Sequence, residues 1–213
     1  MKILIVIPCY NHENYCKKLI SKIENLDILI IDDGSKNPFS LLNCGDNVSI
    51  HRNNINKGKG SCIKFAAQFA KNISKSHILV IDADLQHDPS KIGYFIKESN
   101  FDLVYGKRNF NSDMPILRRL SNTLTSMLIS KVCRKKIYDT QCGFRLYDLN
   151  LFENLNSQEN GYLFETEILL KKINKKSNIN YIEIPTIYNK SNSNINNVKD
   201  TLRFIRLLIN NYI

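Results

Sequence analysis

Short apolar runs, bounded by turn residues and separated by stretches of helical periodicity, constrain the fold of this chain more than any other feature of its sequence. Such runs are typical of strands that are covered on both faces. Between them, Glu13–Glu24 and Ser61–Ile73 carry apolar residues at helical spacing. This alternation predicts an α/β fold with a mainly parallel sheet and helices on both faces. The strands predicted in the first half are Ile3–Ile7, Ile28–Ile31, Val48–His51, Ile78–Ile81 and Phe101–Tyr105.

The second half of the sequence is less regular. It predicts an amphipathic helix at Ile116–Val132, a strand at Phe144–Tyr147, a helix at Glu165–Ile173 and a strand at Tyr181–Ile184. No internal repeat and no long linker divides the chain, and 213 residues is an ordinary length for one α/β domain. We therefore expect a single domain over residues 1–213.

Charge, cysteine content and hydropathy narrow the class of protein. The formal charge of +10 favours a negatively charged partner, but the basic residues are scattered and not interleaved with aromatic residues, which disfavours nucleic acid. The six cysteines form no Cys-x-x-Cys pair, so we expect reduced thiols in a cytoplasmic protein and no zinc site. The N-terminal apolar run is too short for a signal peptide, and no stretch approaches the length of a membrane span.

Acidic residues follow two of the predicted strands. Asp82, Ala83 and Asp84 come directly after one strand, and residues two apart on an extended backbone point to the same side. Two such carboxylates suit Mg²⁺ or Mn²⁺, which bind few protein ligands together with substrate phosphates. Alternatively, one of these carboxylates caps the next helix, a role that Asp88 could also take.

Two further segments belong to the same predicted edge of the sheet, where ligands bind in open α/β folds. Asp32 and Asp33 end a strand and could accept hydrogen bonds from a ribose or base, although an acid-Gly-Ser sequence is also a common structural turn. Asn56–Gly60 precedes a helix, where Lys59 and free backbone N–H groups could meet phosphate. The segment lacks the spacing of a P-loop.

The motifs in five segments of the sequence occur in one order: Ile7–Asn11, Ile31–Ser35, Asn56–Gly60, Asp82–Pro89 and Asp139–Arg145. Together they resemble the family 2 glycosyltransferases with the GT-A fold. Two of them, at 82–89 and 139–145, are similar to those of dolichyl-phosphate and undecaprenyl-phosphate mannosyl- and glucosyltransferases. The resemblance covers the chain to about Asp148 and implies a nucleotide-sugar-binding half at 1–110 and an acceptor-side half at 111–213.

The resemblance implies a role for individual residues. It implies that residues at the predicted edge of the sheet bind the donor and that Asp82, Asp84 and Gln86 bind the metal. The catalytic residues implied are Asp84, Asp139, Arg145 and Glu167. It also implies a UDP- or GDP-linked donor, Mg²⁺ or Mn²⁺, and inversion at the sugar. The donor-binding residues implied are Pro8, Tyr10, Asn11, Asp32, Asp33, Lys59, Asp82, Ala83 and Arg108.

Two acceptors remain open at this point. A polyprenyl phosphate is mostly ionised at neutral pH, so it needs cations rather than a protein base. A hydroxyl of a glycan or lipid-linked saccharide needs a general base, for which Asp139, Glu165 and Glu167 are the candidates. The cations on the acceptor side are Arg118, Arg119, Lys131, Arg134, Lys135, Lys136 and Arg145.

The C-terminal segment Val198–Ile213 is amphipathic and basic. It could be an interfacial anchor, which would hold the protein on the cytoplasmic face of an anionic membrane, or it could pack on the core. A non-catalytic nucleotide-binding module is the alternative from another functional class. A dehydrogenase is disfavoured because the first strand-to-helix turn contains no glycine.

Overall fold

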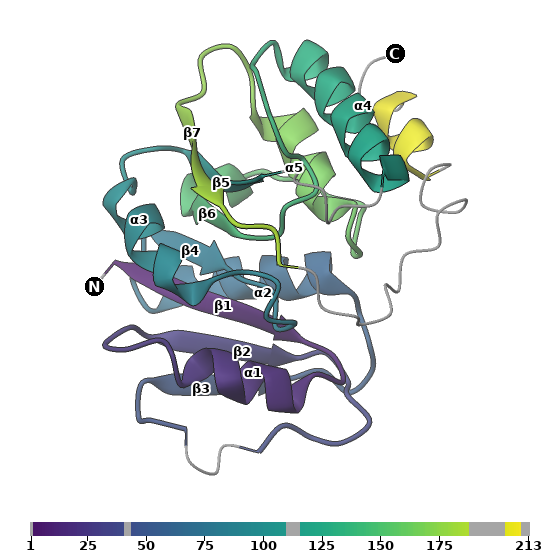
Figure 1. Ribbon diagram of the computed structural model, residues 1–213. Coiled ribbons are helices and arrows are strands. Elements are labelled where there is room, and N and C mark those ends of the chain that lie inside the picture. Colours follow the sequence, from purple (N-terminus) through teal and green to yellow (C-terminus); the bar gives the residue numbers. More distant parts are fainter. Residues whose placement is uncertain (1, 41–43, 110–115, 188–202, 210–213) are drawn as a thin grey trace.

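The computed structural model describes residues 2–40, 44–109, 116–187 and 203–209 of the chain (Figure 1). Seven strands form one sheet in the order β3-β2-β1-β4-β6-β5-β7. Six adjacent pairs hold the sheet together, and only the two that involve β6 are antiparallel. The strands are β1 (Ile3–Cys9), β2 (Ile28–Asp32), β3 (Val48–Arg52), β4 (His77–Val80), β5 (Leu103–Arg108), β6 (Arg145–Asp148) and β7 (Ile179–Ile184).

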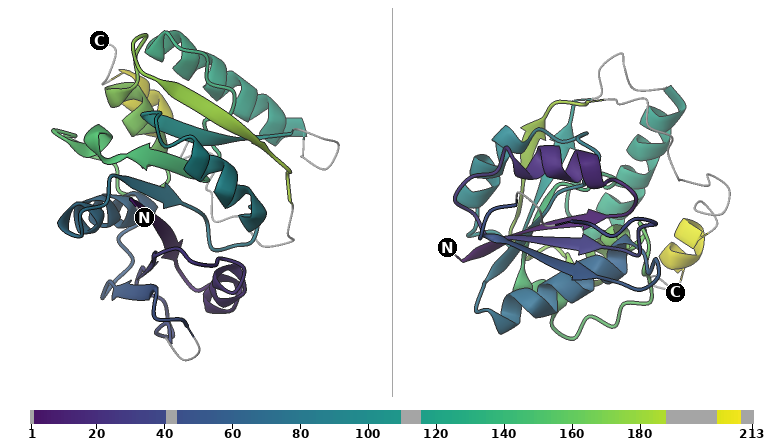
Figure 2. Two further views of the ribbon diagram at one scale, coloured as in Figure 1. Left: turned by 90° about the vertical axis from the view of Figure 1, so that its left-hand side faces the viewer. Right: turned by 90° about the horizontal axis from the view of Figure 1, so that it is seen from below.

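The helices cover both faces of the sheet, as the sequence predicts (Figures 1 and 2). Helices α1 and α3 pack on one face, and α2, α4 and α5 pack on the other. Strand β1 is central and almost fully buried, which explains its unbroken run of branched apolar residues. The helices are α1 (Glu13–Ile20), α2 (Lys59–Asn72), α3 (Ile92–Lys97), α4 (Ile116–Cys133) and α5 (Phe164–Lys172), with 3₁₀ turns at Pro89–Lys91 and Leu149–Phe152.

Most predicted elements are confirmed to within a few residues. The predicted helix at Glu13–Glu24 ends earlier, at Ile20, and the short helix α3 was not predicted. Asp88 caps the 3₁₀ turn before α3 by accepting a hydrogen bond from the Ser90 N–H at 2.9 Å. The capping role that was an alternative for the acids at the end of β4 therefore belongs to Asp88.

Helix α4 is amphipathic as predicted, but its apolar stripe faces outward. Leu120, Leu124 and Met127 are 61%, 59% and 65% exposed. The buried side includes two polar residues, Asn122 and Ser126. Both make hydrogen bonds to the segment that precedes β6, which is why polar groups occupy the inward face.

The described part of the C-terminal segment, residues 203–209, is helical. Leu207 is buried, and Phe204 and Leu208 pack against the core cluster that includes α4 and α5. This supports core packing for these residues, while 198–202 and 210–213 lie outside the described part of the chain. Among the described residues, no helix is both long and apolar enough to cross a membrane.

Candidate active site

The candidate site lies at the edge where the parallel strands β1, β2 and β4 end. Cys9 of β1 is in register with Asp32 of β2, and the N–H of Asp33 donates to the Cys9 carbonyl at 2.8 Å. On the other side of β1, the Ile81 N–H donates to the Val6 carbonyl at 3.0 Å and leads into Asp82. The strand-end acids therefore gather at one edge, as the sequence predicts.

Asp32 shapes the turn at this edge through contacts within the protein. Its side chain is buried and accepts hydrogen bonds from the N–H groups of Ser35 at 2.9 Å and Phe39 at 3.1 Å. It also pairs with Arg52. Burial alone would raise the pKa of Asp32, but these donors outweigh burial and lower it. The family resemblance implies that Asp32 binds the donor, and this role stays a prediction; the pairing with Arg52, 20 residues away, could not be read from the sequence.

Asp33 holds the segment that leads into α2. One carboxylate oxygen accepts from the Asn53 side chain at 2.8 Å and the Lys57 N–H at 2.9 Å, and the other accepts from the Gly58 N–H at 2.8 Å. Gly58 has φ = 92°, and a side chain there would overlap the Asn160 carbonyl. Asp33 and Gly58 together fix where α2 begins and where Lys59 points.

Pro8 near the end of β1 and the residues that follow the strand are more accessible to solvent than Asp32 and Asp33 are. Tyr10 is 41% exposed, and Pro8 is partly exposed. Asn11 has φ = 58°, its N–H donates to Ser35 Oγ at 2.9 Å, and its side-chain oxygen accepts from the Lys36 N–H at 2.8 Å. These contacts join the ends of β1 and β2 and leave the Tyr10 ring accessible to a planar ligand.

Lys59 lies between two carboxylates at the start of α2. Its Nζ is 2.5 Å from Asp82 Oδ1 and 3.2 Å from Glu165 Oε1, and its side chain is only 9% exposed. Burial by itself would lower the pKa of Lys59, but Asp82 and Glu165 outweigh burial and raise it. Lys59 is therefore a fixed positive charge beside Asp82.

The two acids after β4 have opposite electrostatic environments. Burial tends to raise the pKa of Asp82, but Lys59 and then His87 hold it well below its usual range; His87 Nε2 is 3.4 Å from Asp82 Oδ2. Burial and then the charge of Asp82 raise the pKa of Asp84, whose Oδ1 accepts from the Gln86 N–H at 3.0 Å. Ala83 between them is buried and serves as a spacer.

These residues fit a hard divalent cation that shares its coordination with a diphosphate. No group of three His, Cys, Asp or Glu side chains arranged for a metal occurs among the described residues. Mg²⁺ needs only one or two carboxylates when phosphate oxygens complete its shell. Asp82 retains 29% side-chain exposure, and Asp84 and Gln86 are partly exposed beside it. Because Asp82 is paired with Lys59, the lysine and a cation would share this carboxylate.

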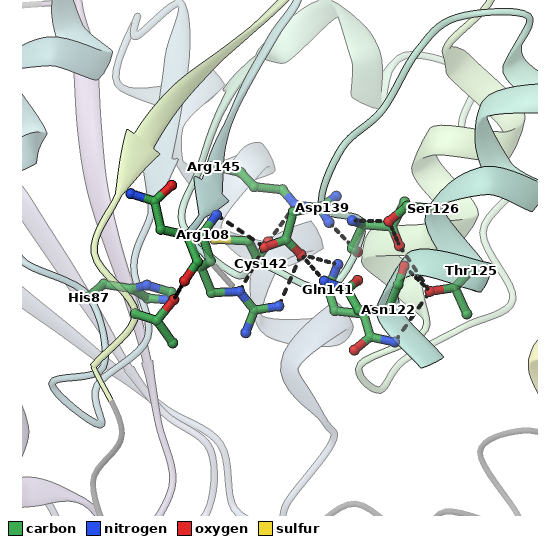
Figure 3. A network of polar contacts seen from close by, with 12 residues as sticks. His87, Arg108, Asn122, Thr125, Ser126, Asp139, Gln141, Cys142 and Arg145 are labelled. Atoms are coloured by element: carbon green, nitrogen blue, oxygen red, sulfur yellow. Dashed lines mark hydrogen bonds and ion pairs between the residues drawn. The ribbon is translucent and has the colours of Figure 1, made fainter. Parts of the chain in front are cut away.

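A second polar network surrounds Asp139 (Figure 3). Arg108 binds the Asp139 carboxylate through Nε at 2.7 Å and Nη2 at 2.9 Å. The Asn122 amide and the Gln141 N–H donate to Oδ1 at 3.0 and 3.1 Å. Burial tends to raise the pKa of Asp139, but Arg108 and Asn122 outweigh it and lower it. In this arrangement Asp139 orients Arg108 and is a weak proton acceptor.

Arg145 is buried and lies away from any open surface. Its three guanidinium nitrogens donate to the carbonyls of Cys142, Glu165 and Thr140 at 2.8, 2.8 and 2.6 Å. It thereby fixes the segment before β6 against α5. The sequence included Arg145 among the cations for an acceptor, whereas the geometry assigns it to positioning Glu165 and the segment around Gly143.

Glu167 also lies apart from the acids at the end of β4. Its side chain is buried and binds Ser157 Oγ, the N–H groups of Gln158 and Glu159, and Lys171. The catalytic role expected for Glu167 is not supported by this position, because all of these contacts anchor the loop before α5. Glu165, two residues earlier, is the acid of α5 that reaches Lys59.

A pocket of about 690 Å³ lies beside the Arg108–Asp139 network. Of the predicted acceptor-side cations, Lys131 and Lys136 line it, Arg134 is exposed, Lys135 and Arg119 are partly exposed, and the side chain of Arg118 is not described.

Two functional candidates were missed by sequence reasoning. His87 lies within the Asp82–Pro89 segment, so its proximity to an acid was a usable signal. Gly143 gave no comparable signal, because its closeness to Asp82 and Lys59 arises only when β6 pairs with β4.

The chain is similar to known proteins in sequence. Residues 4–155 match the family "Glycosyl transferase family 2". An uncharacterized protein of Methanocaldococcus jannaschii is 31% identical, covering 83% of this chain and 84% of the relative. The UDP-N-acetylglucosamine–dolichyl-phosphate N-acetylglucosaminyltransferase of Methanococcus voltae is 26% identical, covering 87% and 86%.

Solved structures give the same fold. Glucosyl-3-phosphoglycerate synthase from Mycobacterium tuberculosis, in complex with Mn²⁺, UDP and phosphoglyceric acid, matches with a TM-score of 0.72 at 15% identity, covering 99% of this chain and 78% of that one. The GT-A fold predicted from the sequence is confirmed. With 152 residues matched to the family and a relative above 30% identity over most of its length, the chain belongs to glycosyl transferase family 2.

Proposed function

We propose that this glycosyltransferase moves a sugar from a nucleoside diphosphate to a polyprenyl phosphate, with inversion and with the help of Mg²⁺ or Mn²⁺. Asp82 and Asp84, with Gln86 beside them, would hold the cation, which supplies charge neutralisation for the diphosphate leaving group. Lys59 adds a second positive charge at the same place. The segment held by Asp33 and the exposed Tyr10 ring would bind the nucleoside.

One observation favours a phosphate acceptor over a hydroxyl. Each acid considered as a general base is already paired: Asp139 with Arg108, Glu165 with Lys59, and Glu167 with Lys171. The pKa values of Asp139 and Glu167 are lowered, so these two carboxylates have a low affinity for the proton of an incoming hydroxyl. An ionised phosphate oxygen needs no base. The name of the relative from Methanococcus voltae, a transferase to dolichyl phosphate, points to the same acceptor class and to a UDP-linked donor.

The test measures transfer from a panel of UDP- and GDP-sugars, with Mg²⁺, Mn²⁺ or EDTA, to a short polyprenyl phosphate. The matched acceptor is the same polyprenol without its phosphate. We expect metal-dependent transfer to the phosphate alone, reduced at least about a hundredfold in Asp84→Asn. The control variant is Asp46→Asn, which removes an exposed carboxylate between β2 and β3.

Each outcome bears on the proposal. Transfer to the polyprenol or to a saccharide hydroxyl, but not to the phosphate, would replace the proposed acceptor. Full activity in EDTA would reject the role of the cation. Donor binding with no turnover on any acceptor would indicate a nucleotide-binding module instead.

A further inference from the structure

Helix α4 presents an exposed apolar stripe that the packing of the described residues leaves uncovered. Ile116, Leu120, Leu124, Met127 and Leu128 are 73%, 61%, 59%, 65% and 39% exposed, and their spacing aligns them along one side of the helix. We call these five residues the α4 face. An 18-residue helix is roughly 27 Å long. Figure 1 shows α4 along the outer edge of the molecule.

All charged side chains in the sequence of α4 and directly after it are positive. Between Ile116 and Tyr138 the sequence contains six Lys and Arg residues and no Asp or Glu. At the C-terminal end of the helix, Lys131, Arg134 and Lys136 are exposed. A long apolar stripe with cations beside it is the arrangement by which a helix lies in the interface of an anionic bilayer.

The pocket beside Arg108 is continuous with this surface. Met127 belongs to the α4 face and also lines the pocket, as do Lys131 and Lys136 from the basic end. A lipid whose chain remained in the bilayer could therefore present its phosphate to the pocket without leaving the membrane. A second copy of the chain would meet the same row of positive charges on its partner, which disfavours self-association through this surface.

We propose that the α4 face, together with Lys131, Arg134 and Lys136, docks the enzyme on an anionic lipid surface and aligns the pocket with it. The inference deepens the proposed function, on which its link to catalysis rests. The binding itself is independent of turnover and is measured without donor.

The first experiment measures binding of the full chain to vesicles of phosphatidylcholine with and without about a third of phosphatidylglycerol. Wild-type protein should bind the anionic vesicles and release them at high salt. The triple variant Leu120→Ser/Leu124→Ser/Met127→Ser should bind at least about tenfold more weakly. Its control is Ile73→Ser/Tyr94→Ser, which removes exposed apolar side chains elsewhere and should bind like wild type.

A second set of variants tests how the positive charges beside α4 contribute to vesicle binding. Lys131→Gln/Arg134→Gln/Lys136→Gln should lose most of the preference for anionic over neutral vesicles. The variant Lys22→Gln/Lys175→Gln/Lys176→Gln neutralises three exposed lysines outside α4 and should keep that preference. Thermal unfolding of each variant checks the fold. In wild-type protein, hydrogen exchange of the α4 amides should slow when anionic vesicles are added.

Three results would overturn the inference: no vesicle binding by wild-type protein, equal loss in the α4 and control variants, or a dimer that the Leu120/Leu124/Met127 variant dissociates while vesicle binding is absent. Failure of the proposed function looks different. Vesicle binding without any sugar transfer would leave the docking surface standing, whereas transfer to a short soluble polyprenyl phosphate without vesicle binding would reject only the docking.

Discussion

Gly143 is the residue whose size most directly limits the candidate active site. A Cβ atom at this position would overlap Asp82 Oδ2 and Lys59 Nζ. We expect Gly143→Ala to displace the carboxylate and lower kcat/KM for sugar transfer at least about tenfold, because small displacements of catalytic groups have large effects on rate. Donor affinity in the presence of Mn²⁺, measured by titration calorimetry, should fall in parallel.

The matched control for this variant is Gly93→Ala in α3. A Cβ atom there has no neighbour within 4 Å, and alanine favours the helix. Gly93→Ala should keep wild-type activity and equal or higher thermal stability. Wild-type kinetics in Gly143→Ala would show that the close approach of Asp82 and Lys59 is dispensable.

The Arg108–Asp139 ion pair should contribute more to the free energy of unfolding than an exposed ion pair does. The Asp139 side chain is fully buried and that of Arg108 is 18% exposed. Asp139→Asn should lower the free energy of unfolding by about 2–4 kcal/mol, since it removes the buried carboxylate charge to which Arg108 donates two hydrogen bonds. In a double-mutant cycle with Arg108→Gln, we expect a coupling energy of at least about 1 kcal/mol.

The Lys107–Glu183 pair provides the comparison for that cycle. Its side chains are 28% and 59% exposed, so its coupling should stay below about 1 kcal/mol. Denaturant unfolding of the single and double variants measures both pairs. If Asp139→Asn kept wild-type stability but lost sugar transfer, Asp139 would be a catalytic residue, as the family resemblance implies. The proposed contribution of Asp139 to stability would then be wrong.

Sequence reasoning at the residue scale succeeded where neighbours in space follow from strand order. Asp33, Lys59 and Asp82 were expected at one edge because the carboxyl ends of parallel strands meet there, and the structure brings all three to it. Arg145 could not be placed in this way. Its burial depends on β6 entering the sheet between β4 and β5, which no local pattern encodes.

At the scale of elements, the loop before α5 depends on one buried acid. Glu167 accepts from the N–H groups of Gln158 and Glu159 and pairs with Lys171. Burial tends to raise the pKa of Glu167, but Lys171 and Ser157 outweigh burial and lower it below the ordinary value of 4.5. A lowered native pKa means that Glu167 stabilises the fold above that value and that this contribution is lost as the pH falls through the native pKa.

Glu167→Gln should therefore destabilise the protein by about 2 kcal/mol at pH 7. The difference from wild type should shrink as the pH falls from about 4.5 towards the lowered native pKa, because the unfolded wild-type chain then takes up a proton that the folded protein does not. Denaturant unfolding across pH 3–8 measures this. Glu153→Gln, in an exposed pair with Lys71, is the control and should stay within about 0.5 kcal/mol of wild type at every pH. A pH-independent difference for Glu167→Gln would exclude a charge-based role.

The orientation of α4 shows a limit of periodicity as a predictor of structure. A spacing near 3.6 residues predicts that Leu120, Leu124 and Met127 share one side of a helix, but it does not identify what that side meets. Two hydrogen bonds with the segment before β6 turn the polar side inward: the Asn122 amide donates to Asp139, and Ser126 Oγ accepts from the Thr140 N–H. These partners are more than ten residues away in the chain, so the exposed apolar stripe could be recognised only in the structure.

For the molecule as a whole, the order of strands joins residues 1–110 to residues 111–213 in one sheet. Strand β6 comes from the second half, yet it lies between β4 and β5 of the first. Leu146 is in register with Leu79 on one side and Val104 on the other. The sequence predicted each of these strands, but not that β6 would run antiparallel between two strands that precede it.

This interleaving predicts that residues 1–110 do not form an independent folding unit. Without β6, the described part of the sheet has no strand that joins β5 to β4. Without α4 and α5, the sheet face that carries Ile78, Val80 and Tyr105 loses part of its apolar cover. We expect the fragment 1–110 to unfold without a cooperative transition, while the full chain unfolds in one step with coincident changes in circular dichroism and tyrosine fluorescence. Mixing the fragment with residues 111–213 should restore part of that transition. A sigmoidal unfolding curve for 1–110 alone would instead establish the nucleotide-binding half as a separate domain.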